Sequence, residues 1–197
     1  MFFESKNLLT TIKEFVMQNS GQDDIHGFPH IMRVCDLCQK IGEKLNANLK
    51  VLTTASLLHD ISRKNENVNL NHAEISAGIA RDYLYSLGDH FSNKEIEKIL
   101  HCIRAHSFSN ELPPNSLEAK ILSDADKLDA LGAIGLYRMI IYSHNLIKNG
   151  GIKKVIEHLE SKILKLKDQI YLDISEEIAK ERYKIILDFY NEIKKEI

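Results

Sequence analysis

Proline, glycine and cysteine are scarce in this chain of 197 residues, which contains 3 Pro, 9 Gly and 3 Cys. So few helix-breaking residues exclude a collagen-like or disordered composition and favour helices. An odd number of cysteines does not make a disulfide framework, so we expect an intracellular, reducing compartment. The longest apolar run, near Leu136 to Tyr142, contains Arg138 and falls far short of the roughly 18 residues that a membrane-spanning helix needs. The first residues also lack the order of a secretory signal, and we therefore expect a cytoplasmic protein with no membrane partner.

An excess of charge of either sign is also missing. The sequence has 26 Lys and Arg against 28 Asp and Glu, a formal net charge of -2, and these residues are scattered along the chain. A dedicated nucleic-acid surface is therefore not favoured. The length allows one domain over residues 1–197, with a core at about 18–142 and C-terminal helices at about 152–195 packed on it.

Apolar residues recur at intervals of three and four, as at Ile12, Phe15 and Val16, and strict alternation is hard to find. This pattern predicts an all-α fold. The capping motifs Ser92 to Glu95 and Asp173 to Glu176 mark two helix starts, and Gly88 suits the left-handed position after a helix. The expected helices are Glu4–Asn19, Pro29–Leu45, Leu49–Ile61, His72–Leu87, Asn93–Ala105, Leu117–Leu122, Asp129–Ile147, Ile152–Lys167 and Ile174–Lys195.

Three segments place His or Asp beside strongly apolar residues: His26 to Val34, Ala55 to Asp60, and Ser123 to Asp129. An unpaired carboxylate at Asp60, at the expected end of a buried helix, would cost several kcal/mol, so a partner is expected. A cation is the simplest partner, although an Asp can also cap a helix and hold a neighbouring His. A set of imidazoles and carboxylates suits Mn²⁺, Fe²⁺, Zn²⁺ or Co²⁺, and Mg²⁺ less well.

These three segments, in their order along the chain, resemble the HD-domain metal-dependent phosphohydrolases. Members of that family have an early His, a His-Asp pair at a helix end and a late Asp on another helix. The similarity covers about Gln18 to Tyr142. It implies an HD-domain helical bundle. The segments around His30, His59-Asp60 and Asp126 resemble a small bacterial and archaeal branch of stand-alone members that is associated with nucleotide pyrophosphohydrolase activity.

Carried over residue by residue, the resemblance implies one divalent ion, with Mn²⁺ favoured, held by His30, His59, Asp60 and Asp126. Asp124 is the alternative to Asp126. The same resemblance makes His106 a candidate proton donor or phosphate contact. Dinuclear relatives recruit additional His residues, so His72, His101 and His106 leave room for a second ion, although we expect one.

Positive charge is expected near the reacting phosphate, because charge builds on its oxygens. We expect Lys127 and Arg138 to supply it, and a structural ion pair with a carboxylate is the alternative for each. For Arg63 and Lys64 we expect plain solvent exposure. Cys35 and Cys38 form a Cys-x-x-Cys pattern, but they share a helix with regularly spaced apolar residues and are expected in the core rather than at a zinc site.

The expected function is hydrolysis of a nucleotide or related small phosphate ester by a metal-activated water, with Asp60, Lys127, His106 and Arg138 in catalytic roles. A (d)NTP pyrophosphohydrolase is favoured. The alternatives are 5'-nucleotidase or phosphodiesterase activity at the same site, a non-catalytic metal- or nucleotide-binding regulatory module, and a di-iron oxygenase with more ligands. We expect a monomer or a homodimer.

Overall fold

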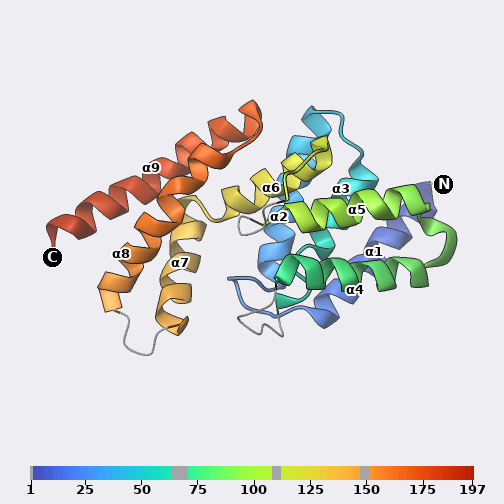
Figure 1. The fold of residues 1–197 in the computed structure, drawn as a ribbon, viewed down its shortest axis with the longest axis horizontal. Coiled ribbons are helices and arrows are strands. Elements are labelled where there is room, and N and C mark those ends of the chain that lie inside the picture. Colours follow the sequence, from blue (N-terminus) through green and yellow to red (C-terminus); the bar gives the residue numbers. More distant parts are fainter. Residues whose placement is uncertain (1, 64–70, 108–111, 147–150) are drawn as a thin grey trace. The chain divides into compact units, whose positions relative to one another are not determined.

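A computed structural model describes residues 2–63, 71–107, 112–146 and 151–197, and the regular elements in these ranges are helical (Figure 1). The predicted all-α fold is therefore confirmed. The helices are α1 (Phe2–Asn19), α2 (Phe28–Lys44), α3 (Leu49–Leu58), α4 (His72–Ser86), α5 (Asn93–Ala105), α6 (Leu117–Asp129), α7 (Gly132–Leu146), α8 (Gly151–Ser161) and α9 (Asp173–Lys195). None of them is long and apolar enough to cross a membrane.

The chain forms two compact units, of which the first extends to Ser123. Helix α3 is the centre of this unit and packs against α1, α2 and α5, while α4 lies beside α5 (Figure 1). The sequence of α3 is mostly apolar, and its residues from Val51 to Leu58 are buried except Thr53. A helix with this composition is stable only when other helices surround it. The end of α3 therefore lies inside the first unit.

Local signals set several helix ends as predicted. The Ser92 side chain accepts the backbone N–H of Glu95 while Glu95 accepts the Ser92 N–H, so α5 begins with the predicted capping box. Gly88 has φ of 67°, the left-handed conformation expected after α4. Asn71 caps α4 by accepting the N–H groups of Ala73 and Glu74.

The second unit runs from Asp124 to Ile197. In it α7 packs against both α8 and α9, and a 3-10 segment over Ile163–Gln169 packs against α8 and α9. Its buried apolar side chains include Met139, Leu159 and Ile186. Gly132 has φ of 79° and lies against Arg182, whose guanidinium donates to the Leu128 carbonyl at 2.6 Å. This bond ties α9 to the end of α6.

Several predicted boundaries were wrong: α3 ends at Leu58 and not at Ile61, and α7 begins at Gly132 and not at Asp129. Helix α6 continues to Asp129 instead of stopping at Leu122, because Leu122, Ala125 and Leu128 keep helical spacing and are all buried. Helix α8 ends at Ser161 and is followed by the 3-10 segment. Asp173 is the first residue of α9 and not its cap, since Leu172 takes the capping position without a side-chain bond.

Candidate metal centre

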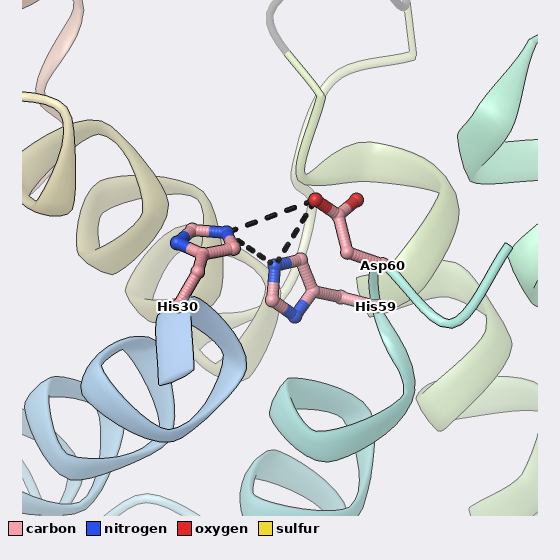
Figure 2. Close-up of side chains that lie close together, drawn as sticks. All are labelled: His30, His59 and Asp60. Carbon is pink, nitrogen blue, oxygen red and sulfur yellow. Dashed lines mark hydrogen bonds and ion pairs between the residues drawn. The ribbon is translucent and has the colours of Figure 1, made fainter. Parts of the chain in front are cut away.

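His30, His59 and Asp60 meet in the interior of the first unit (Figure 2). The Nε2 atoms of the two imidazoles are 3.3 Å apart, and Asp60 Oδ2 lies 3.7 Å from His30 Nε2 and 3.9 Å from His59 Nε2. The residues are 0%, 0% and 2% exposed. We call them the first group. Three buried donor atoms at such separations suit a single ion with bonds of about 2.0–2.2 Å.

The end of α3 presents two adjacent ligands in one direction. His59 is the C-cap residue of α3, and the chain turns immediately after it. Its Nδ1 lies 2.7 Å from the Ser56 carbonyl oxygen. A carbonyl only accepts, so Nδ1 carries the proton and Nε2 keeps its lone pair for the site. The side chains of His59 and Asp60 therefore reach the same point at the end of α3, with Nε2 and Oδ2 3.9 Å apart.

The start of α2 holds His30 in place. Gly27 is the N-cap residue, and a Cβ there would lie 2.4 Å from the Asp23 carbonyl oxygen and 2.6 Å from that of Gly21. Only glycine fits this turn. The turn is closed by the Phe28 N–H, which donates to the Gly21 carbonyl at 2.7 Å. The ring of His26 then lies edge-on to that of His30, with centroids 6.1 Å apart.

Two further imidazoles face the other oxygen of Asp60. Asp60 Oδ1 lies 3.5 Å from His106 Nε2 and 3.7 Å from His72 Nε2. We call Asp60, His72 and His106 the second group. His106 is the C-cap of α5, and its Nδ1 lies 2.5 Å from the Ile103 carbonyl oxygen, so it repeats the arrangement of His59. His72 opens α4, and its carbonyl oxygen accepts the Ser62 hydroxyl at 3.0 Å.

A positive side chain joins the two groups. Arg63 Nε lies 3.3 Å from Asp60 Oδ2, and its Nη2 lies 3.1 Å from His72 Nε2. Only 19% of its side-chain surface is exposed. The expected solvent exposure of Arg63 was wrong, because the turn after Asp60 folds it back onto the carboxylate. Lys64 lies outside the described residues. An arginine three residues after the His-Asp pair was the available signal for this contact.

The charge of Asp60 is set by its neighbours. Burial acts to raise its pKa, but the Arg63 guanidinium and the imidazoles of His59 and His106 outweigh this effect and hold the pKa well below the usual value. The carboxyl group is therefore ionised at neutral pH. Oδ1 of this buried carboxylate has no hydrogen-bond partner among the described residues. A buried, charged oxygen that faces two imidazole rings is an arrangement that a cation satisfies. These nitrogen and oxygen donors therefore fit a divalent ion of intermediate softness, such as Mn²⁺, Fe²⁺, Zn²⁺ or Co²⁺.

The structure does not bring His101 into either group. Its Nε2 accepts the backbone N–H of Asn115 at 3.2 Å, so it holds the loop before α6. Cys35 and Cys38 are buried free thiols, as expected for core residues, and belong to neither group.

The remaining candidates belong to the second unit. Asp126 lies on the last turns of α6. Its neighbour Lys127 is buried, with Nζ 4.9 Å from the centre of the Tyr171 ring, and burial lowers the Lys127 pKa against the opposing effect of Asp124 and Asp126. The Asp124 carboxylate accepts the N–H groups of Tyr171 and Leu172 at 2.9 Å and 3.1 Å. Asp124 therefore anchors the approach to α9, which weakens the alternative that it is a metal ligand.

Arg138 makes an ion pair with a carboxylate, which was the alternative to a contact with the substrate phosphate. Its Nη1 lies 2.6 Å from Asp129 Oδ2, and the two side chains are 9% and 2% exposed. This pair links α6 to α7 inside the second unit. A contact between Arg138 and substrate stays a prediction.

Comparisons with known proteins identify a family model and several relatives that are similar to this chain. The HD domain family model matches residues 27–131. The protein YpgQ of Bacillus subtilis is 30% identical over 204 residues, covering 98% of this chain and 94% of the relative. A crystal structure of YpgQ in complex with ADP has a TM-score of 0.77 and 28% identity, covering 98% and 96% of the two chains. A crystal structure of an HD-superfamily hydrolase from Bacillus thuringiensis has a TM-score of 0.71 and 27% identity, covering 98% and 96%.

Proposed function

The chain belongs to the HD-domain family, and we propose that it hydrolyses nucleoside triphosphates to nucleoside monophosphate and pyrophosphate with one divalent ion held by the first group. Membership supports a metal-dependent phosphohydrolase in general. The substrate and the preference for Mn²⁺ are the finer parts of the proposal.

The observation that carries the proposal is the geometry of the first group. His59 has its lone pair directed at the site by the Ser56 carbonyl, and the charged Oδ2 of Asp60 lies within 4 Å of both imidazole nitrogens. No rearrangement of α3 is needed to hold an ion. A divalent ion bound there would lower the pKa of a water and withdraw charge from a phosphoryl oxygen.

Other residues complete the proposed site through the resemblance. Asp126 is proposed as the fourth ligand, and Lys127 and Arg138 as groups that offset charge on the phosphate. His106 is proposed to donate a proton to, or contact, the phosphate. Its place 3.5 Å from Asp60 Oδ1, next to the first group, supports this role.

A nucleotide is the proposed substrate class. The support is the ADP complex of the YpgQ structure, which is similar to this chain over nearly its whole length. An ADP molecule contains the base, the ribose and the α–β phosphoanhydride, which is the bond that hydrolysis of a triphosphate to monophosphate and pyrophosphate breaks.

The test is product release from a panel of nucleoside mono-, di- and triphosphates. Metal-stripped protein is supplied in turn with Mn²⁺, Co²⁺, Mg²⁺, Zn²⁺ or Fe²⁺, and phosphate and pyrophosphate are measured separately. We expect metal-dependent pyrophosphate release from triphosphates, fastest with Mn²⁺. Orthophosphate from monophosphates would instead identify a 5'-nucleotidase. No release with any ion would favour a binding module.

Variants connect the activity to the first group. Asp60→Asn and Asp126→Ala are each expected to lower kcat/KM more than about 100-fold, because each removes a proposed ligand. His101→Gln is the matched control, since His101 lies on the neighbouring helix α5 but in neither group. Far-UV circular dichroism checks that each variant is helical. Retained turnover in Asp60→Asn would contradict the proposed centre.

A further inference from the structure

The second group offers the same kinds of donor atom as the first, yet it differs from the first in one contact. Asp60, His72 and His106 would supply one carboxylate oxygen and two imidazole nitrogens. However, Arg63 Nη2 lies 3.1 Å from His72 Nε2. The same guanidinium reaches Asp60 Oδ2 through Nε at 3.3 Å.

The two ends of this guanidinium have different consequences for metal binding. An arginine only donates, so His72 Nε2 must accept with its lone pair, and an imidazole nitrogen has one lone pair. That is the pair an ion in the second group would need. A carboxylate oxygen has about two lone-pair sites, so Asp60 Oδ2 can accept from Arg63 and still serve the first group.

Charge acts in the same direction. The guanidinium is protonated at any physiological pH, and its side chain is mostly buried beside Asp60. The second group contains one carboxylate, and both groups share it. A second dication would therefore lie beside a fixed positive charge as well as beside the first ion, and Asp60 is the one carboxylate that the second group offers it.

From this contact we propose that Arg63 restricts the centre to one ion by holding His72 Nε2. The inference rests on the proposed function, because it assumes that the first group binds the catalytic ion. In this arrangement the Nη2 end of the Arg63 guanidinium lies against His72 Nε2, where a second ion would otherwise bind. It is a positioning residue for His72.

The test is the number of ions bound per chain. Metal-stripped full-length protein is saturated with Mn²⁺, dialysed and analysed for metal content, and electron paramagnetic resonance then detects magnetic coupling between neighbouring ions. We expect one uncoupled ion per chain in the wild type and two coupled ions in Arg63→Met, which removes both the charge and the donor. Arg63→Met combined with His72→Ala is expected to return to one.

A matched control removes an arginine elsewhere in the first unit. Arg104 pairs with Glu74 between α5 and α4, and Arg104→Met is expected to keep one ion per chain. Two ions in the wild type, or one ion in a folded Arg63→Met, would overturn the inference and leave the first group intact. No ion in the wild type would instead overturn the proposed function, and the inference with it. The number of ions bound by the wild type tests the inference by itself, so the inference can be overturned even if Arg63→Met misfolds.

Discussion

Arg138 either stabilises the fold through its ion pair with Asp129 or contacts the substrate, and one substitution distinguishes these two roles. Their closest atoms are 2.6 Å apart, and both side chains are nearly buried. At an effective dielectric constant near 20 the Coulomb attraction at this distance is about 6 kcal/mol, and desolvation of the two ions offsets part of it. Replacement by methionine would leave the Asp129 carboxylate buried beside an apolar chain. We therefore expect Arg138→Met to lower the free energy of unfolding by about 3–5 kcal/mol.

The assay is thermal and urea unfolding followed by far-UV circular dichroism. A loss of this size corresponds to a fall in Tm of about 6–20 °C for a chain of this length. Arg138→Met combined with Asp129→Leu should recover much of the loss, because no unpaired charge is left. kcat/KM is measured in parallel below the transition. If Arg138→Met unfolds like the wild type but loses kcat/KM, the ion-pair reasoning is refuted and substrate contact is favoured.

Three further outcomes test other parts of the structure. The capping box and Lys50 lower the Glu95 pKa from the ordinary value of 4.5 to about 2, so ionised Glu95 stabilises the fold above pH 4.5. The free energy of unfolding lost in Glu95→Gln, measured by urea titration, should therefore shrink as the pH falls from about 4.5 towards 2. Gly27→Ala should destabilise by on the order of 1–3 kcal/mol and weaken Mn²⁺ binding measured by calorimetry, because the added Cβ meets backbone oxygens in the turn before His30; unchanged affinity would contradict this. Cys35→Ser should retain metal-dependent turnover, and equal loss to that in Asp60→Asn would show that the thiol is not merely a core residue.

The parts of the fold that depend on neighbouring residues could be predicted from the sequence. Helix α5 begins and ends where the apolar spacing and the Ser92–Glu95 box placed it. The prediction failed at α6, which continues past Leu122 to Asp129 with Ala125 and Leu128 buried at helical spacing. Helix propensity is a weak guide when tertiary packing covers one face of a helix.

For the centre, the sequence predicted through its resemblance that His30, His59 and Asp60 act together, and the structure brings these three side chains to one point. The sequence did not determine that His72 and His106 lie at Asp60 Oδ1, or that Arg63 lies between His72 and Oδ2. Those residues are separated by up to 46 positions along the chain, from 60 to 106. Periodicity reports the face of one helix, whereas their meeting point depends on how α3, α4 and α5 pack together. Only the tertiary structure decided which histidines lie against the same oxygen of Asp60. The number of ions that the centre is proposed to hold depends on that arrangement.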